Sequence, residues 1–445
     1  MIKRGFGWML SLLTAFQLPS CQFNVNVETL LSPPRLTEEQ EQIYQALQAA
    51  AGQSVSLKYP KSGTRLSAFL VEDFDGDGAD EAIVFYNSNR IVADENPLRL
   101  CLLDQKDGKW RAVTHYTTAG AEVERVDVEY LGENPKKNII ISYSMVDGAE
   151  RTAEIFQYES GALQQTLSLP FSILTVADLN ADGTQELFVA AAAKQPSPAT
   201  AAVYSLAEDG SYPPPAQVSL PESFADVTRM SSGLLPEIEG QLPAIYLDGA
   251  SGATTVQTAV LTYEAQRLSL IYTDSADRPF STARPSGWQA MDIDNDGEIE
   301  IPVQATFYGY QTDANTPGIS MTGWDVCRGG QLMREYASYY AVQNNYVFIM
   351  PSRWERKVTA AMESEEVVFY EFDRNVNAAD GTPVKKTELL RLAVVDDPVA
   401  ADAMEQDGYL MLRKKYGNYY MAKRTVRNHS LSITDSELIL AMRIL

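Results

Sequence analysis

From Asp73 to Glu81 the chain reads Asp-Phe-Asp-Gly-Asp-Gly-Ala-Asp-Glu. Acidic residues take the first, third and fifth positions, a glycine takes the sixth, and a glutamate takes the ninth. In a tight turn, this alternation brings every second side chain to the same side, and the glycine permits the sharp reversal of the backbone. The pattern therefore predicts a turn that surrounds a hard cation such as Ca²⁺ with oxygen ligands.

The same spacing recurs twice. One copy runs from Asp178 to Glu186 (Asp-Leu-Asn-Ala-Asp-Gly-Thr-Gln-Glu), and the other runs from Asp292 to Glu300 (Asp-Ile-Asp-Asn-Asp-Gly-Glu-Ile-Glu). In the second copy, Asn180 offers an amide oxygen in place of a carboxylate. Three acidic turns that bind nothing specific are the alternative, but a glutamate at the ninth position of every copy favours cation binding. We call these stretches loops 1, 2 and 3.

An EF-hand is a rival interpretation, and the sequence argues against it. That motif requires a bidentate glutamate at position twelve and a helix after the loop. Position twelve is a valine in all three copies, and each loop is followed by a short apolar run that predicts a strand. We therefore expect each loop to lie between two strands.

The loops begin at residues 73, 178 and 292, so they are 105 and 114 residues apart. Midway between them, residues 125–142 and 228–247 keep a strand, turn and strand pattern without the acidic side chains. Five units thus run from 66 to 345. In the first two units, we expect further strands at 98–103, 110–117, 151–158 and 163–169. Four short strands per unit at this period indicate the blades of a β-propeller, and burying both faces of every blade requires a closed ring.

These units resemble FG-GAP/VCBS-type repeats, the calcium-loop blades of integrin-like propellers. The resemblance covers about 280 residues and rests on the three intact loops. It implies a structural calcium ion in the turn between the first two strands of a blade. The implied side-chain ligands are Asp73, Asp75, Asp77, Glu81, Asp178, Asn180, Asp182, Glu186, Asp292, Asp294, Asp296 and Glu300, and the implied backbone-carbonyl ligands are Ala79, Thr184 and Glu298. This family commonly has seven blades, so the ring is either small or completed by the C-terminal tail.

Residues 1–21 resemble a bacterial lipoprotein signal peptide. Lys3 and Arg4 precede an apolar run from Phe6 to Phe16, which is too short to span a bilayer, and the stretch ends at Cys21. The resemblance implies lipidation of Cys21 and anchoring to the outer face of the bacterial cell membrane. Pro19 departs from the small residue usual at its position. The alternative is an ordinary secretory signal, which would also place the protein outside the cytoplasm.

The regions on either side of the repeats have different patterns. Residues 22–36 contain Ser-Pro-Pro and predict a flexible tether, whereas residues 37–65 predict a helix and a lead-in strand. Thr37 and Gln40 form a capping-box signature that opens the helix Glu38–Ala51. Residues 346–445 predict a small C-terminal α+β domain, with strands near 357–362, 366–372, 389–395, 409–414 and 419–424, a helical turn at 399–405 and a final helix at 434–442. The alternative is that two sheets of this region form further blades.

Charge and cysteine content limit the partners. The chain has 36 Lys and Arg residues against 59 Asp and Glu residues, a net charge of −23, which opposes binding to nucleic acid or directly to anionic lipid. We expect contact with the membrane through the lipid anchor only. Cys101 and Cys327 belong to no metal-binding motif, and either a disulfide or two buried free thiols would fit the sequence.

The sequence carries no recognisable catalytic set. Its two histidines, His115 and His429, belong to no nucleophile motif. We therefore expect a surface-anchored binding or scaffold protein that binds a protein or glycan, rather than an enzyme. An extracellular polysaccharide-active lyase or hydrolase is the alternative. Aromatic residues of the fifth unit would either pack between blades or present a face for sugar rings or a peptide: Trp288, Tyr308, Tyr310, Trp324, Tyr336, Tyr339 and Tyr340.

Overall fold

A computed structural model of the protein describes residues 36–52, 55–88, 96–145, 150–237, 240–275, 281–311 and 319–445. The region predicted as a signal peptide, including Cys21, lies outside the described residues, as does nearly all of the predicted tether. Within the described ranges, no helix has both the length and the apolar character needed to cross a membrane.

The described residues form six antiparallel sheets in chain order, of which the first three lie in the N-terminal half. The first sheet contains β1 (Ser56–Leu57), β2 (Phe69–Glu72), β3 (Glu81–Asn87), β4 (Leu98–Lys106) and β5 (Lys109–Thr117). The second sheet contains β6 (Glu122–Tyr130), β7 (Lys137–Ser144), β8 (Arg151–Glu159) and β9 (Ala162–Pro170). The third sheet contains β10 (Ile173–Ala177), β11 (Glu186–Ala191), β12 (Thr200–Tyr204) and β13 (Ala216–Ser219).

The other three sheets complete the chain. The fourth contains β14 (Asp226–Glu237), β15 (Gly240–Ala250), β16 (Thr255–Glu264), β17 (Arg267–Tyr272) and β18 (Arg284–Pro285). The fifth contains β19 (Ile301–Thr306), β20 (Ser320–Arg328), β21 (Gln331–Ala341), β22 (Tyr346–Ile349) and β28 (Met442–Ile444). The sixth contains β23 (Val358–Glu363), β24 (Glu366–Asn377), β25 (Pro383–Val395), β27 (Asn418–Arg424) and β26 (Leu410–Lys415).

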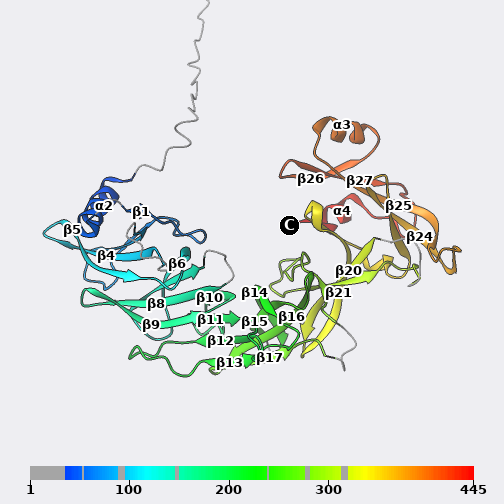
Figure 1. Ribbon diagram of the computed structural model, residues 1–445. Helices are drawn as coiled ribbons and strands as arrows, with labels where there is room; N and C mark the ends of the chain where they lie inside the picture. The colour runs from blue at the N-terminus through cyan, green and yellow to red at the C-terminus, as the bar shows by residue number, and fades with distance from the viewer. Residues whose placement is uncertain are drawn as a thin grey trace, which may run out of the picture.

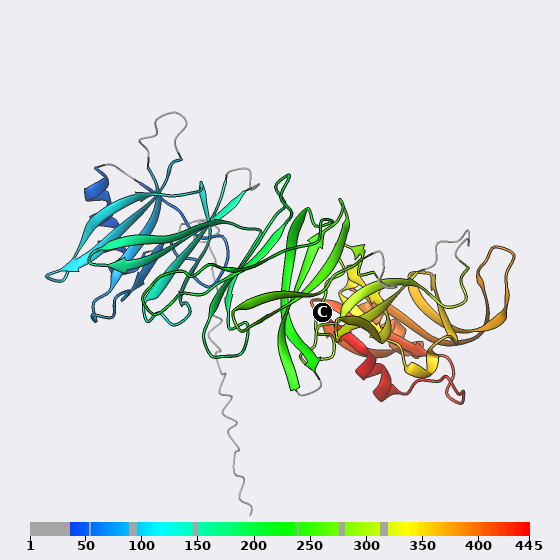
Figure 2. The ribbon, with the colours of Figure 1, turned by 90° about the horizontal axis from the view of Figure 1, so that it is seen from below.

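The sheets follow one another around an arc, as the blades of a propeller do (Figures 1 and 2). In the second, third and fourth sheets, the first strand (β6, β10 or β14) lies on the inner side of the arc and the last main strand lies on the outer side (Figure 1). The chain is thus mainly β, with repeated antiparallel sheets of about four strands each and a small helical contribution near the C-terminus. This confirms the predicted fold class.

Central strands are apolar on both faces because each sheet packs against a neighbouring sheet on both sides or, at the two ends, against one sheet and a helix. In β3, for example, every residue from Glu81 to Tyr86 is buried. Buried apolar clusters join the first sheet to the second, the second to the third, the third to the fourth, the fourth to the fifth and the fifth to the sixth. Stacking of successive sheets therefore supplies most of the apolar burial that stabilises the fold.

The expected closure of the ring is wrong. Among the described residues, no buried cluster joins the sixth sheet to the first, and the two sheets lie at opposite ends of the arc (Figure 1). Helix α2 (Glu38–Ala51) instead covers the first sheet with Ile43 and Leu47, and helix α3 (Pro398–Gln406) covers the sixth with Ala401. A terminal sheet can bury its outer face under a helix, so sheet packing alone does not require a ring.

The C-terminal region is shared between two sheets. Strand β22 pairs with β21, and β28 returns from the end of the chain to pair with β22, so both complete the fifth sheet. The remaining strands form one sheet, not the two further blades considered as an alternative. Helix α4 (Asp435–Ala441) precedes β28, and its Glu437 accepts hydrogen bonds of 2.6 and 3.0 Å from the guanidinium of Arg353.

A buried ion pair fixes the segment between the fourth and fifth sheets. The side chain of Arg284, in β18, is fully buried, and its guanidinium lies 2.7 Å from the carboxylate of Asp248 in β15. Its Nε donates to the backbone carbonyl of Trp288 at 2.7 Å, and a second nitrogen donates to Thr258 at 2.8 Å. This network holds the chain in place shortly before loop 3 begins.

Candidate metal centres

Strand pairing places loops 1 and 2 where the sequence predicted them. Glu72 at the end of β2 pairs with Glu81 at the start of β3, and Ala177 at the end of β10 pairs with Glu186 at the start of β11. Loop 3 differs because Met291 and Glu300 form an isolated bridge, and no first strand of normal length precedes the loop. In every loop, however, the ninth-position glutamate ends the turn at a buried place in a sheet.

The three loops share one hydrogen-bonding scheme. The ninth-position glutamate accepts the backbone N–H of the loop's second residue, at 3.0, 3.0 and 2.9 Å in loops 1, 2 and 3. The first-position aspartate accepts the N–H of the sixth-position glycine, at 3.0, 2.9 and 3.0 Å. The fifth-position aspartate accepts the N–H of the seventh residue, at 2.8 Å in all three. Backbone donors therefore orient the carboxylates before any cation binds.

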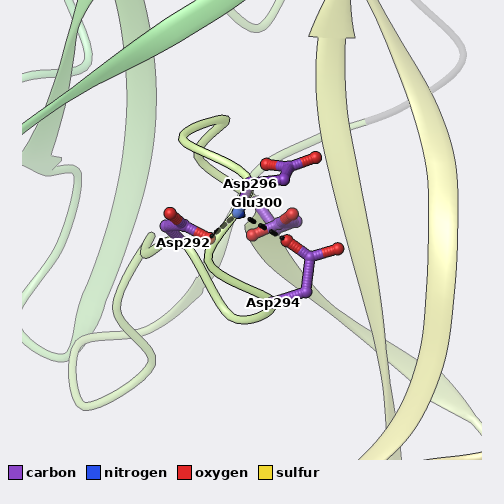
Figure 3. Close-up of side chains that lie close together, drawn as sticks. All are labelled: Asp292, Asp294, Asp296 and Glu300. Atoms are coloured by element: carbon purple, nitrogen blue, oxygen red, sulfur yellow. Dashed lines mark hydrogen bonds between the residues drawn. The ribbon is translucent and has the colours of Figure 1, made fainter.

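Loop 3 brings its four predicted carboxylate ligands together. One oxygen from each of Asp292, Asp294, Asp296 and Glu300 lies within 4.8 Å of every other. Figure 3 shows these side chains converging around the turn, with the backbone N–H of Asp296 donating to Asp292 and Asp294 at 3.2 Å each. Four negative groups at this separation repel one another unless a cation lies between them.

Glu300 shows that this arrangement suits a cation. Its side chain is fully buried, and its Oε2 accepts the N–H of Ile293, whereas its Oε1 is buried without a hydrogen-bond partner in the described structure. Burial raises the pKa of Glu300 to about 8, and the charges of Asp294 and Asp292 add to the rise. A buried carboxylate that has one oxygen without a donor and lies in a cluster with three other acids fits a divalent cation.

Loop 1 is similar but less complete. Asp73, Asp75 and Glu81 each place an oxygen within 4.8 Å of the others, whereas Asp77 does not join this cluster. Burial raises the pKa of Glu81 to about 7, and the charge of Asp75 contributes. Loop 1 therefore offers three converging carboxylates, with Asp77 bound to the backbone of its own turn at Ala79.

Loop 2 has its acids more dispersed, and Asp178, Asp182 and Glu186 do not form a cluster of the same closeness. The cause is local, because Asp182 accepts hydrogen bonds from the amide of Asn180 at 2.8 Å and the hydroxyl of Thr184 at 2.6 Å. The Thr184 hydroxyl and backbone hold the pKa of Asp182 below its usual value. A cation at loop 2 would have to displace these contacts.

The seventh residue of each loop, Ala79, Thr184 or Glu298, was expected to bind the cation through its backbone carbonyl. Only Glu298 has a charged side chain. Its side chain forms an ion pair of 3.2 Å with Arg328. Its N–H donates to Asp296, as those of Ala79 and Thr184 donate to their own loops. The carbonyl ligands themselves stay a prediction.

Tyr336 is a neighbour of loop 3 that sequence reasoning did not assign to it. Its hydroxyl, on β21, donates to Asp294 at 2.6 Å. Tyr336 is 42 residues away from Asp294 in the chain, so no local spacing indicates the contact. It orients the carboxylate of Asp294 from the adjacent hairpin.

The other aromatic residues of the fifth unit mainly pack. Trp288 and Trp324 are buried with Tyr340 between them, at ring-centroid distances of 5.6 and 5.7 Å. Tyr308, Tyr310 and Tyr339 are partly buried against the core that joins the fifth and sixth sheets. These contacts favour the packing interpretation over an aromatic binding face.

The two histidines contact neighbouring polar side chains, and two of the cysteines are buried. His115 lies 2.8 Å from the hydroxyl of Tyr86, and burial lowers its pKa; His429 lies 3.4 Å from a carboxylate oxygen of Glu371. Cys101 and Cys327 are both buried and take part in no disulfide, which confirms the interpretation as two buried thiols. Burial raises the pKa of the Cys101 thiol to about 12, so it is unreactive near neutral pH.

No protein-family model matches the sequence, and no curated protein matches it. Among solved structures, a rhamnogalacturonan lyase from Bacillus licheniformis is 10% identical over 75% of this chain and 77% of its own, with a TM-score of 0.29. An endo-arabinase from Bacteroides thetaiotaomicron is 9% identical over 75% of this chain and 98% of its own, with a TM-score of 0.20. The β-propeller domain of the trilobed protease from Pyrococcus furiosus is 10% identical over 74% of this chain and 89% of its own, with a TM-score of 0.22. We draw no argument about function from likenesses of this size.

Proposed function

We propose that this protein is an extracytoplasmic calcium-binding scaffold whose surface binds a protein or glycan. The observation that carries the proposal is loop 3, where Glu300 has a buried, unpartnered oxygen and its carboxylate clusters with those of three aspartates. Side-chain oxygens of this kind are the ligands that calcium prefers, and a bound ion would cancel their repulsion. Calcium would then fix the turn that leads into the fifth sheet.

The proposed location follows from the sequence. A lipid on Cys21 would anchor the chain to the outer face of a bacterial membrane, and residues 22–36 would act as a tether. Calcium sites with a Kd of about 10⁻⁴–10⁻³ M are sufficient outside the cytoplasm, where calcium is plentiful. The net charge of −23 supports contact with the membrane through the lipid alone.

Terbium luminescence tests the cation site, because Tyr336 contacts Asp294 and would sensitise a lanthanide held by loop 3. We expect emission that rises on titration of the wild-type chain with terbium and falls when calcium is added in competition. Asp292→Asn should remove the part of both effects that comes from loop 3, leaving any emission from loop 1, whereas the exposed Glu264→Gln should leave both effects unchanged. Equal emission from wild type and Asp292→Asn would refute cation binding at loop 3.

A polysaccharide-active enzyme is the second candidate, and a pocket of about 590 Å³ supports it. The pocket lies at the ends of β7, β9 and β11, on the opposite edge of the second and third sheets from the turns that correspond to the loops. Glu124, Glu150 and Asp226 line it together with Arg151 and Lys194. Carboxyl and cationic groups in one pocket are the groups that acid–base chemistry on a glycan requires.

Glu124 is the best-positioned carboxylate in this pocket. It accepts hydrogen bonds from Ser144 and, at 2.8 Å, from Lys61. Burial alone would raise its pKa, but these two hydrogen bonds hold the pKa of Glu124 below its usual value. Glu124 would therefore be ionised near neutral pH and suited to accept a proton or to pair with a cationic group.

Glycan turnover distinguishes the two candidates. The purified chain would be incubated with neutral and acidic polysaccharides, and both retention on immobilised glycan and release of new reducing ends would be measured. Retention without release supports the scaffold. Release that disappears in Glu124→Gln, but persists in Glu264→Gln, would instead establish the enzyme.

A further inference from the structure

Loop 3 borders a pocket of about 370 Å³ whose opposite wall is basic. Asp292 and Asn295 line the side formed by the loop. Arg413, Lys414 and Lys415 line the other side from β26 of the sixth sheet, and Arg443 lines it from β28 of the fifth. Two sheets thus bring four cationic side chains to the edge of the proposed calcium site.

These cations have no carboxylate partners in the described structure. Lys415 donates to the backbone carbonyl of Ile444 at 3.4 Å, and Arg413 donates to that of Leu412 at 3.0 Å. Lys414 lies over the ring of Tyr419, 4.5 Å from its centroid. None of the four cations forms an ion pair within the described ranges, although acids exceed bases by 23 in the whole chain.

Arg443 gives a second indication of a missing partner. Its Nε is buried and has no hydrogen-bond acceptor in the described structure. An arginine presents its donors in a planar fork that matches the two oxygens of a carboxylate. The Arg443 guanidinium therefore has unused donor capacity beside the pocket, and an anion would satisfy it.

Charge balance favours an anion here once calcium is bound. A divalent ion leaves two of the four negative charges of loop 3 uncompensated, and the four cations of the opposite wall outnumber them. Calcium takes six to eight oxygen ligands, so it can accept a further oxygen from a ligand beyond those of the loop. An anionic group between loop 3 and the basic wall would contact both the bound calcium ion and the arginine and lysine side chains.

The surroundings favour a sugar as the carrier of that anion. Tyr416 follows Lys415 directly, and 76% of its surface is exposed. Lys415 lies 4.8 Å from the centroid of this ring, so Tyr416 stands beside the basic wall. An exposed aromatic ring next to cationic groups offers stacking for a sugar ring and charge pairing for its carboxylate.

We propose that the pocket between loop 3 and the basic wall binds the carboxylate of an acidic sugar, with Arg443 and Arg413 as its charge partners and the loop 3 cation as an additional contact. The inference rests on the proposed calcium site and adds a ligand class to it. Uronate-containing glycans are the ligands with this chemistry.

Isothermal titration of the full chain with a trimer of galacturonate would test the proposal, with a neutral galactose trimer and inorganic phosphate as comparison probes. We expect the acidic trimer to bind in the presence of calcium and not in its absence, and we expect neither the neutral trimer nor phosphate to bind. Arg413→Gln and Arg443→Gln should each weaken it at least fivefold, and Glu300→Gln should weaken it by removing the cation. The matched control is Arg111→Gln, because Arg111 is exposed on the distant β5.

Each other outcome has a definite meaning. If terbium reports a cation at loop 3 and the acidic trimer does not bind, the ligand inference is refuted and the calcium proposal stands. If loop 3 holds no cation, the proposed function itself fails. Binding of phosphate without the trimer, or an equal loss in Arg413→Gln and Arg111→Gln, would refute the acidic-sugar site. The exposed Arg413 keeps the test valid if Arg443→Gln does not fold.

Discussion

Glu300→Gln should reverse its effect on stability according to whether calcium is present. In the calcium-free protein, the pKa of Glu300 is raised to about 8, so its carboxyl group is mostly protonated near neutral pH. The substitution then replaces one neutral group with a neutral amide of the same shape, and glutamine can still accept the hydrogen bond from Ile293. Exchanging neutral groups costs little, and the substitution also removes the minor charged form, which is buried without a partner. We therefore expect the free energy of unfolding of the calcium-free variant to equal or exceed that of the wild type. A loss of up to about 1 kcal/mol would still be consistent, because the amide can form poorer hydrogen bonds than the carboxyl group.

With calcium, the order should invert. A ligand that binds the native state stabilises it by RT ln(1 + [L]/Kd). For a site with a Kd of about 10⁻⁴–10⁻³ M, this gives about 1.4–2.7 kcal/mol at about 10 mM calcium. The calcium-induced gain in the free energy of unfolding should therefore be smaller by about that amount in Glu300→Gln than in the wild type.

Urea unfolding followed by circular dichroism measures this difference, with and without calcium. Glu264→Gln is the matched control, because Glu264 is an exposed residue of β16 and undergoes the same chemical substitution. It corrects for the general screening of a chain with a net charge of −23 by added cation. Equal calcium-induced gains in wild type and Glu300→Gln would refute our account of loop 3.

Three further predictions concern the rest of the fold. Arg284→Met should lower the free energy of unfolding by about 3–5 kcal/mol, because it leaves the carboxylate of Asp248 buried without its partner; urea midpoints measure this, and a loss below about 1 kcal/mol would contradict it. Hydrogen bonds from the guanidinium of Arg353 and from the backbone of Thr434 hold the pKa of Glu437 at about 2. The contribution of ionised Glu437 to the free energy of unfolding is therefore complete above its unfolded-state pKa of about 4.5 and is lost as the pH falls toward 2. The stability gap between wild type and Glu437→Gln, below about 1 kcal/mol because Glu437 is half exposed, should accordingly be constant from pH 7 to 6 and narrow in acid. A thiol reagent should leave Cys101 and Cys327 unmodified in the native chain and label both in urea, and rapid native labelling would contradict their burial.

Local patterns predicted the elements closely. The capping box of Thr37 and Gln40 predicted a helix at Glu38–Ala51, and α2 has those bounds. Strands expected at 151–158 and 163–169 are found as β8 and β9, each extended by about one residue at an end or both. These signals depend on residues a few positions apart, which is why sequence alone contains them.

Contacts between distant residues could not be predicted in the same way. The short strand β28 joins the fifth sheet beside β22, although about 95 residues separate the two in the chain. Tyr336 contacts Asp294 of loop 3 from a different hairpin. Asp182, which was expected to bind a cation, instead accepts a hydrogen bond from Thr184. Neither the partner of an edge strand nor the choice of a side-chain rotamer is encoded in spacing.

The sequence by itself determined the three acidic turns, their glutamates at or directly before the start of buried strands, and the repeated antiparallel sheets, because each depends on the order of neighbouring residues. Only the tertiary structure decided that helices cover both ends of an open arc and that loop 3 faces Arg413 and Arg443 across a pocket. The physical reason is that such contacts depend on how successive sheets stack, and stacking is decided by the packing of whole surfaces.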